Sequence, residues 1–309
     1  MKTAVKIKVV GVGGSGSNTI SRMAKSKIKG VELVAINTDG QDLGKVHSHY
    51  KIRIGRNLTK GLGTGMSPEI GKKAAEEQKE EISKILKDSD MIFVACGLGG
   101  GTGSGASPVV AEIAKNSGAL TIGIITKPFS FEGLSRMRIA ERSQKLLKKK
   151  VDALLVIQND KLLEILEPNT TILNAFWMCD DILRQAVQGI SDLVSLSGII
   201  NVDFANVKTI MKNSGTALFG IGKAKGEGRA ERAALAAINS PLLNLSLKGA
   251  KGILFNISGG RDISLSEIDE ISRIFTEAVS PEAKIVFGAV YDEKLKKGEL
   301  KVTVIATGF

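Results

Sequence analysis

The 309-residue sequence has few of the side chains that build disulfides, metal centres or base-stacking surfaces. Its two cysteines, Cys96 and Cys179, lie far apart in apolar contexts, which is typical of buried free thiols in a reducing cytoplasm. Its two histidines, His47 and His49, have no cysteine or acidic pattern beside them that would suit a metal. Aromatic residues make up 4% of the chain, which argues against a stacking platform for nucleic acid.

Two further absences concern membranes and nucleotide motifs. No apolar run reaches the roughly 20 residues of a membrane span. The first 14 residues enter a strand-like run without the small-residue cleavage site of a signal peptide. We therefore expect a cytoplasmic protein without a transmembrane segment. The sequence GxxxxGK[ST] is missing as well, so the chain is not a P-loop NTPase.

The positive charge is concentrated in one half of the sequence. The net charge is +11, but residues 1–150 carry 26 basic and 13 acidic side chains, whereas residues 151–309 carry 17 and 19. The basic residues are scattered through helical patterns, and only Lys148–Lys150 form a run. We therefore expect no nucleic-acid partner, and a basic nucleic-acid-binding module stays a weaker alternative. The asymmetry suits contact between opposite halves of successive molecules.

The first half alternates between strand and helix patterns. Most of its strand-like runs are continuous Val, Ile, Leu and Ala, as in strands buried on both faces. This alternation predicts a parallel, Rossmann-like α/β sheet with helices on both sides. The predicted strands are residues 4–12, 31–38, 91–97, 120–126 and 153–159, and the predicted helices are residues 17–27, 68–87, 106–116 and 131–149.

The pattern changes after residue 169. Residues 170–198 keep one helical period and are long enough to cross a domain. Beyond them, strands follow one another more directly, which predicts a smaller α/β domain with a mixed sheet. We therefore predict a first domain at residues 1–169, a central connecting helix at 170–198 and a second domain at 199–309.

Glycine-rich segments stand between strands and helices. The segment "GGGTGSG", residues 99–105, follows one predicted strand, and "GVGGSGSN", residues 11–18, follows the first. Glycine lets an anion approach the free N–H groups of a helix start, so these loops predict phosphate binding. A third segment, "GLGTGMSPEIG", also opens a helix. Several such loops at one sheet edge suit a nucleoside triphosphate.

Two other interpretations of the glycine loops remain. A tight strand-to-helix turn needs one or two glycines, not five. An NAD-linked oxidoreductase would need an acidic residue at the end of the second strand, where this chain has "NTDG", residues 37–40. The oxidoreductase also leaves "GGGTGSG" without a use.

The motifs resemble the FtsZ family, the bacterial and archaeal relatives of tubulin. "GGGTGSG" is similar to the tubulin-family signature, and further segments match FtsZ in order along essentially the whole chain. These segments are "NTD", "NLTKGLGTGMSPEIGKKAAEE", "TKPFSFEG", "LRQAVQGISDLV", "INVDFANVKTIM", "GEGRAERAA", "SPLLN" and "VTVIATGF". The resemblance implies a GTPase that binds GTP or GDP with Mg²⁺ in its first domain and polymerises head to tail.

The resemblance also implies the site residues. Phosphate contacts fall on the two glycine loops, whereas guanine and ribose recognition falls on Asn18, Glu132, Arg136, Phe176 and Asp180. Asp180 can accept from the N–H edge of guanine, and Phe176, one helical turn earlier, can stack on the base. Asp39 is expected near the magnesium, through water. The complete implied GTP site is Gly13, Gly14, Ser15, Gly16, Ser17, Asn18, Asn37, Thr64, Gly65, Gly101, Thr102, Gly103, Glu132, Arg136, Asn159, Phe176 and Asp180.

The catalytic loop implied by the resemblance is "NVDFAN", from Asn201 to Asn206. In FtsZ such a loop acts on the GTP of the next subunit and normally holds two aspartates that position the attacking water. This chain has Asp203 but Asn206 in the second place. Losing a general base typically costs about 10²–10⁴ in rate, although phosphoryl transfer depends more on positioning. Slow or absent hydrolysis by a scaffold that still binds GTP and polymerises is therefore the alternative to normal hydrolysis.

The resemblance implies a cellular role. FtsZ filaments form the scaffold of the division ring, so we expect a cytoplasmic protein at the division site. Its expected partners are further copies of itself in a head-to-tail homopolymer, a membrane-tether protein and other division proteins.

Overall fold

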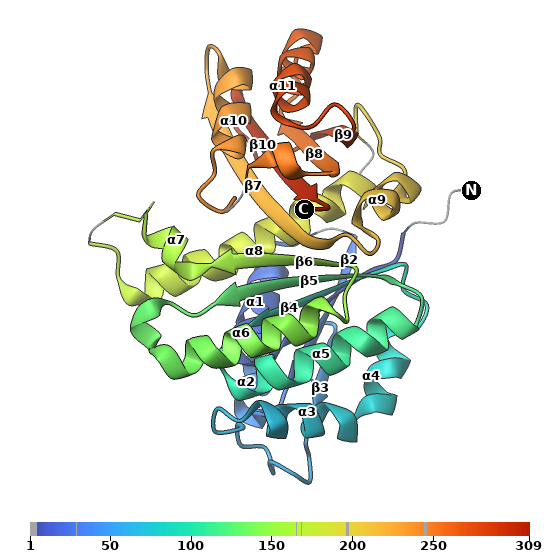
Figure 1. Cartoon of the computed structure of the whole chain (residues 1–309), viewed down its shortest axis with the longest axis vertical. Helices are drawn as coiled ribbons and strands as arrows, with labels where there is room; N and C mark the ends of the chain where they lie inside the picture. Colours follow the sequence, from blue (N-terminus) through green and yellow to red (C-terminus); the bar gives the residue numbers. More distant parts are fainter. Residues whose placement is uncertain (1–4, 29, 165, 168, 196–197, 244–245) are drawn as a thin grey trace. The chain divides into compact units, whose positions relative to one another are not determined.

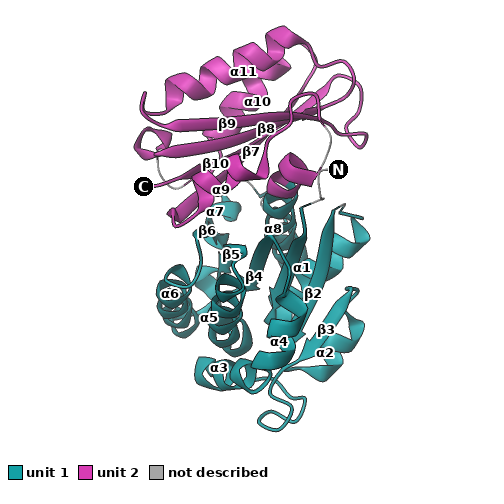
Figure 2. Ribbon diagram, turned by 90° about the vertical axis from the view of Figure 1, so that its right-hand side faces the viewer, with its two compact units in different colours: residues 1–188 teal, residues 189–309 magenta. Residues whose placement is uncertain are grey.

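The computed structural model describes residues 5–28, 30–164, 166–167, 169–195, 198–243 and 246–309. The chain divides into two compact units, Met1–Gln188 and Gly189–Phe309, which Figure 2 shows in different colours. Each unit is described by itself. Among the described residues, no helix combines the length and the apolar composition needed to cross a membrane.

The first unit contains a parallel sheet, as the alternating pattern predicts. Every described strand pair in this unit is parallel, and the spatial order is β3-β2-β1-β4-β5-β6. The strands read as continuous apolar runs because both faces are covered; β4, for example, is buried from its first residue to its sixth. The bounds are β1 (Ile7–Val12), β2 (Val31–Asn37), β3 (Tyr50–Arg53), β4 (Met91–Gly97), β5 (Leu120–Lys127) and β6 (Ala153–Gln158).

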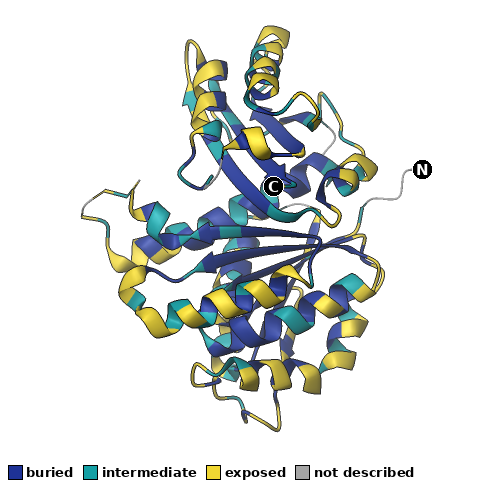
Figure 3. Cartoon of the chain, viewed as in Figure 1, coloured by how far each residue is buried: buried dark blue, intermediate teal, exposed yellow. Residues whose placement is uncertain are grey.

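Helices cover both faces of this sheet. Helices α5 and α6 lie on one face and α1 on the other (Figure 2). In Figure 3 the strands are buried and the outer sides of the helices are exposed. The helices are α1 (Gly13–Lys25), α2 (Gly40–Lys45), α3 (Pro68–Glu77), α4 (Lys79–Leu86), α5 (Gly101–Asn116), α6 (Leu134–Lys148) and α7 (Asn159–Leu163), with a 3-10 turn η1 (Ser130–Glu132).

Some predicted boundaries in this unit are wrong. The helix predicted at 68–87 breaks at Gln78, which ends α3 and precedes α4, while its side-chain Oε1 accepts a hydrogen bond from the N–H of Gly55. Helix α5 begins at Gly101 rather than at residue 106, so most of the glycine segment is helical. The short elements β3 and α2 were not predicted.

A long helix, α8 (Ile172–Ser195), leads from the first unit into the second. It agrees with the helix predicted at 170–198 except at the ends, and residues 196–197 lie outside the described part of the chain. The division between the units falls inside α8, after Gln188. The predicted domain boundaries at 169 and 198 stay a prediction.

The second unit has the mixed sheet that the sequence predicts. Strand β10 is antiparallel to β7 and β8, whereas β8 and β9 are parallel, in the order β7-β10-β8-β9. Phe255 stacks on Phe275 and Phe287, with ring centroids 4.6 and 5.2 Å away, in the core of this unit. The elements are α9 (Phe204–Met211), β7 (Gly215–Lys225), α10 (Arg229–Ile238), a 3-10 turn η2 (Leu247–Gly249), β8 (Gly252–Gly259), α11 (Leu265–Ala278), β9 (Lys284–Tyr291) and β10 (Glu299–Thr307).

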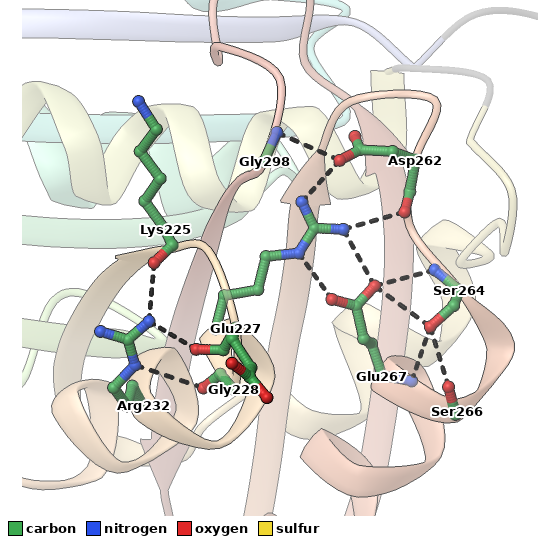
Figure 4. A network of polar contacts seen from close by, with 10 residues as sticks. Lys225, Glu227, Gly228, Arg232, Asp262, Ser264, Ser266, Glu267 and Gly298 are labelled. Atoms are coloured by element: carbon green, nitrogen blue, oxygen red, sulfur yellow. Dashed lines mark hydrogen bonds and ion pairs between the residues drawn. The ribbon is translucent and has the colours of Figure 1, made fainter.

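One polar cluster joins three connections of the second unit (Figure 4). Arg229, at the start of α10, is 6% exposed and donates from Nη1 to Asp262 at 2.7 Å and from Nε to Glu267 at 2.5 Å. Asp262 also accepts from the backbone N–H of Gly298 at 3.1 Å, and Glu267 completes the capping box of α11 with Ser264. All three charged side chains are therefore paired.

Candidate functional site

The site lies at one edge of the first sheet. In a parallel sheet the carboxyl ends of the strands share an edge, and ligands bind where the strand order reverses direction. Here the reversal lies between β1 and β4, which are neighbours. The segments that follow these two strands are the two glycine loops, because α1 begins at Gly13 and α5 at Gly101. The fold thus brings together loops that are almost 90 residues apart in the sequence.

A cleft of about 310 Å³ opens at this edge. Its walls come from the segments after β1, β4, β5 and β6, from the loop before α3 and from α8. Twelve predicted GTP-site residues line it: Gly14, Ser15, Thr64, Gly65, Gly101, Thr102, Gly103, Glu132, Arg136, Asn159, Phe176 and Asp180.

Two helix starts point backbone donors at the cleft. No side chain caps the N-terminus of α1 or α5, and neither helix has an acidic residue in its first turn. The first N–H groups of a helix have no intrahelical partner and carry a partial positive charge. Gly14, Ser15 and Gly101–Gly103 lie in these first turns and line the cleft. The arrangement is suited to binding phosphate groups.

The glycines of "GGGTGSG" do two different jobs. A Cβ atom on Gly103 would lie 2.6 Å from the carbonyl oxygen of Gly97, and one on Gly105 would lie 1.9 Å from that of Pro68. These glycines therefore permit close packing of α5 on β4 and α3. Gly100 lines the cleft, and a Cβ atom there would meet nothing within 4 Å. The phosphate interpretation accounts for only part of the glycine content.

The hydroxyl groups of this segment are engaged within the protein. The Oγ1 of Thr102 lies 2.8 Å from that of Thr38 and 3.4 Å from that of Thr64. The Oγ of Ser104 accepts from the N–H of Gly99 at 2.9 Å, and Ser104 does not line the cleft. Ser104 therefore stabilises the turn after β4.

Asp180 is the most perturbed carboxylate of the cleft. Its Oδ2 accepts from Nε of Arg22 at 3.0 Å and its Oδ1 from the hydroxyl of Thr19 at 3.3 Å. Burial raises its pKa to about 6, although Arg22 and Thr19 both act to lower it. At neutral pH the group is therefore a charged acceptor in the cleft. Neither Arg22 nor Thr19 was predicted, because both lie on α1, some 160 residues before Asp180.

The pocket beside Asp180 has an aromatic wall and an unpaired acceptor. Phe176 is 38% exposed and meets Phe129 edge to face, with ring centroids 5.5 Å apart. Asn159 is 4% exposed, and its Oδ1 has no hydrogen-bond partner in the described part of the chain. A buried acceptor without a partner is costly, so it indicates a ligand or water that donates to it. A flat base with N–H donors on its edge satisfies both features.

Glu132 and Arg136 form the outer lip of the cleft. Arg136 donates from Nη1 to Glu132 at 2.9 Å, while the other oxygen of Glu132 accepts from the N–H of Phe129. Glu132 thus fixes the start of η1 and orients Arg136. The pair offers both an acceptor and a cation to a sugar hydroxyl or a phosphate.

Two carboxylates, Asp39 and Asp42, lie close to the first glycine loop, and only Asp39 was predicted there. Asp39 caps α2, accepting at Oδ1 from the N–H groups of Gln41 and Asp42. The Oδ2 of Asp42 accepts from Asn37 and lies 3.8 Å from the position a Cβ atom on Gly14 would take. Burial and the nearby Asp39 raise the pKa of Asp42.

These groups fit a magnesium ion held mainly by a nucleotide. The described residues contain no group of three or more His, Cys, Asp or Glu side chains that could hold a metal. Mg²⁺ commonly takes one or two carboxylates together with phosphate oxygens and waters. Asp42 is the carboxylate nearer Gly14, so it would hold such an ion better than Asp39, whose Oδ1 already caps α2.

The cleft does not include every predicted residue, and it includes others. The predicted residues that do not line it are Gly13, Gly16, Ser17, Asn18, Asn37 and Asp39; their roles stay predictions. The lining residues that were not predicted are Met66, Gly97, Leu98, Gly100, Thr126, Pro128 and Cys179. Most of these are apolar or glycine, so no chemical signal in the sequence marked them. Burial raises the pKa of Cys179 to about 12, so this thiol stays protonated.

The predicted catalytic loop belongs to the second unit. The side chain of Asp203 is exposed and caps α9 by accepting from the N–H of Ala205 at 3.1 Å. The side chain of Asn206, in the first turn of α9, is exposed as well. Asn201 accepts from the N–H of Gly198 at 2.8 Å, which fixes the turn before the loop.

Comparison with known proteins decides the family. The family model "Tubulin/FtsZ family, GTPase domain" matches residues 6–167, and "FtsZ family, C-terminal domain" matches residues 215–309. The chain belongs to the tubulin/FtsZ family. An FtsZ dimer from M. jannaschii, solved empty, is 46% identical with a TM-score of 0.96, over 100% of this chain and 89% of that one.

Two more distant solved structures share the fold. CetZ1 from Haloferax volcanii, solved as a GDP-bound monomer, is 22% identical with a TM-score of 0.84, over 99% of this chain and 94% of that one. CetZ2 from the same organism, solved as a GTPγS-bound protofilament, is 22% identical with a TM-score of 0.81, over 98% and 92%.

The family assignment gives the chemistry of the first unit. The chain carries the GTPase domain of the tubulin/FtsZ family, which implies binding of GTP and GDP and, in general, hydrolysis of GTP. The cleft of the first unit agrees in position and donor set with such a ligand. The family assignment decides against the NAD-linked oxidoreductase, whereas the expectation of no nucleic-acid partner stays a prediction.

Proposed function

We propose that this chain is a GTP-dependent filament protein of the FtsZ type. The observation that carries the proposal is the cleft at the strand-order reversal. Two uncapped helix starts serve the phosphates there, and Asp180 with Asn159 serves the base. The charged Asp180 accepts from the N1–H and the 2-amino group of guanine, whereas adenine offers no such pair of donors on that edge. Phe176 supplies a face for stacking.

Hydrolysis is proposed to need a second copy of the chain. The water-positioning candidates Asp203 and Asn206 belong to the second unit, whereas the cleft is built from the first. Both side chains are exposed at the N-terminus of α9, where a neighbour can reach them. A head-to-tail homopolymer brings this helix end onto the next subunit's nucleotide. The relative CetZ2 was solved as a protofilament, which supports self-association.

The rate of hydrolysis depends on the loop's single carboxylate. Asp203 can orient a water and accept its proton, but its own carboxylate also caps α9. Asn206 can orient a water through its amide oxygen and cannot act as a base. We therefore propose slow, assembly-dependent hydrolysis. Since phosphoryl transfer depends mainly on positioning, the site keeps activity above that of the free nucleotide.

The cellular proposal follows from the family. We propose a cytoplasmic division-ring scaffold whose partners include a membrane-tether protein. Mg²⁺ is proposed to accompany the nucleotide, beside Asp42.

The test is phosphate release as a function of protein concentration, with filaments followed by sedimentation. We expect turnover per subunit to rise above a critical concentration and then level off, with pelleting in GTP and in a non-hydrolysable analogue but not in GDP. A rate per subunit that does not change with concentration would mean that one chain holds the whole site.

A further inference from the structure

Most of the basic residues of the first half lie outside the cleft, and several of them lie on α6. This helix carries five basic residues and one acidic residue, Glu141. Four exposed cations follow one another along the outer side of α6 and its C-cap residue at spacings of four, three and four residues. At 3.6 residues per turn these positions form a single stripe. We call Arg138, Arg142, Lys145 and Lys149 the basic stripe.

The basic stripe has no counter-charges, whereas its neighbours on the same segment do. Arg136 pairs with Glu132 at 2.9 Å, and Lys150 pairs with Glu112. Within the described residues no ion pair joins a carboxylate to any member of the stripe. Four like charges within one helix repel one another, by a few tenths of a kcal/mol per i,i+4 pair. A solvated charged face of this kind is ordinary on a protein surface. It indicates a binding site only where a neighbouring feature points to a ligand as well.

Beside the stripe runs an apolar groove of about 550 Å³, which we call the α5 groove. Its floor is α5, and its walls are α6 on one side and α3 with the start of α4 on the other; Figure 1 shows α5 between α3 and α6. Five apolar side chains on α5 and α6 line it, Pro108, Val109, Ile113, Ile139 and Leu146, and charged side chains from α3, α4, α5 and α6 border them. Leu146 is 57% exposed, next to Arg142 and Lys149 on the surface of α6.

The two walls of the groove differ in charge. On the wall formed by α3 and the start of α4, Lys72 and Glu76 lie 3.8 Å apart, and Glu69 is offset by Lys79, so this wall has no net charge. On the α6 wall, Arg142 is unpaired and leads into the rest of the stripe. A negatively charged ligand is therefore attracted to one side of the groove and not to the other.

We propose that the α5 groove and the basic stripe together bind an amphipathic helix of a partner protein, with its apolar side chains on α5 and its Asp or Glu side chains along α6. The groove floor from Ser104 to Ile113 is about 14 Å long at 1.5 Å per residue, which matches two to three turns of a helix. Such a helix presents apolar anchors at i, i+4 and i+7. An anionic bilayer fits less well, because the apolar side chains line a hollow instead of projecting from the surface.

The test uses a fluorescein-labelled 14-residue peptide with leucines at i, i+4, i+7 and i+11, glutamates on one flank and alanines elsewhere. Anisotropy should give a Kd in the range of about 10–100 μM at 0.1 M salt. The variant with Arg138, Arg142, Lys145 and Lys149 all changed to Glu should weaken binding at least about 10-fold, because like charges then face each other. Leu146→Gln should weaken it about 3- to 10-fold through lost apolar contact. GTP affinity should stay unchanged in both variants.

A matched control carries the same change in charge elsewhere. Lys248, Lys251, Lys296 and Lys297 are exposed in the second unit, and changing all four to Glu should alter the Kd less than about twofold. An equal loss in this control would overturn the proposal, since net charge alone would then explain binding. Unchanged binding by Leu146→Gln would remove the groove from the interaction. Stripe-dependent binding of phosphatidylserine vesicles without binding of the peptide would assign the surface to a membrane instead.

Discussion

The cleft of the first unit and the Arg229 cluster of the second are both polar sites built from distant segments, but they are completed differently. In the Arg229 cluster, every charged group has a partner of opposite charge from the same chain (Figure 4). In the cleft, Asn159 keeps a buried acceptor without a partner, and two helix starts have no cap. A closed network stabilises a fold, whereas an open one leaves room for a ligand.

Asp180 combines features of both sites, because it is paired within the protein and still has lone pairs free for a ligand. It is paired with Arg22 and Thr19 inside the protein, yet burial keeps its pKa at about 6. Arg22 also lies over the ring of Trp177, 5.5 Å from its centroid, which fixes the guanidinium. The internal partners thus keep the carboxylate ionised and oriented, and the remaining lone pairs of its two oxygens stay available to a base.

The largest expected effect concerns Asp180 in the cleft of the first unit. Asp180→Ala should weaken GTP binding by about 10³-fold, because two hydrogen bonds to a charged group are lost at roughly 1.5–3 kcal/mol each. Asp180→Asn should instead shift preference from guanine towards xanthine, since the amide nitrogen donates to the 2-oxo group. Titration calorimetry with GTP and XTP measures both. Near-normal GTP affinity in Asp180→Ala would place the base elsewhere.

Substitutions in the Arg229 cluster should change the stability of the protein and leave GTP binding unchanged. Arg229→Met removes four hydrogen bonds, three of them to carboxylate oxygens of Asp262 and Glu267, and leaves these two acids facing each other. The free energy of unfolding of the second unit should therefore fall by about 2–3 kcal/mol. Urea unfolding followed by far-UV circular dichroism measures this. The matched control is Arg232→Ala, because Arg232 is exposed and donates only to the carbonyls of Gly228, Lys225 and Glu227; we expect less than about 1 kcal/mol.

GTP affinity separates the two sites in the Arg229→Met variant. The cleft is built from the first unit, so its affinity for GTP should be unchanged at temperatures where the variant is folded. A loss of affinity would show that the polar cluster of the second unit acts on the cleft, and the contrast between a structural and a ligand-binding site would fail.

The catalytic loop is proposed to act on the GTP of a neighbouring chain, so a change in this loop should alter turnover and leave the chain's own GTP binding unchanged. Asn206→Asp should raise GTP turnover in filaments by roughly 10-fold, on the scale of a general base, and shorten filament lifetime. Monomer affinity for GTP should stay the same, since Asn206 does not line the cleft. Phosphate release and light scattering provide the measurements. Unchanged turnover would mean that Asp203 alone suffices or that another step limits the cycle.

The sequence predicts the parallel sheet, the mixed sheet and most cleft residues for identifiable reasons. Apolar runs and glycine loops are local signals, so β4 and the glycine segment after it could be found directly, although the helix start at Gly101 was placed five residues too late. Elements with weak local signals were missed. Strand β3 has one buried residue, Ile52, and α2 contains two glycines that lower its helix propensity.

Other features depend on distant segments and could not be predicted. The need for glycine at position 105 comes from the carbonyl of Pro68, which lies on α3. The partners of Asp180 are Arg22 and Thr19 on α1, and no short-range pattern connects them to α8. Asp42 was overlooked because its closeness to Gly14 arises only when β1 and β2 pair side by side.

The smallest expected effect is the pH dependence of GTP binding. With a pKa of about 6, Asp180 is mostly ionised at pH 7 and about one-quarter ionised at pH 5.5, so GTP affinity should fall about fourfold between these values.

The folded-state pKa of Asp180 lies above the ordinary 3.8, so between pH 6 and 4 the folded protein binds more protons than the unfolded chain. This group therefore adds stability as pH falls through that window, while GTP affinity declines. The hydrogen bonds from Arg229 hold the pKa of Glu267 below 4.5. Glu267 therefore stabilises the folded state above pH 4.5, and this contribution to stability is lost in stronger acid. Affinity should thus decline well before the second unit is destabilised. Fluorescence of mant-GTP across pH 7.5–5.5 measures the GTP affinity, and unfolding followed in parallel measures the stability. Arg22→Gln should move the decline in GTP affinity to higher pH, because a positive charge that lowers the pKa of Asp180 is lost. A decline at the same pH in this variant would assign the titration to the nucleotide's own phosphates and not to the base-binding carboxylate.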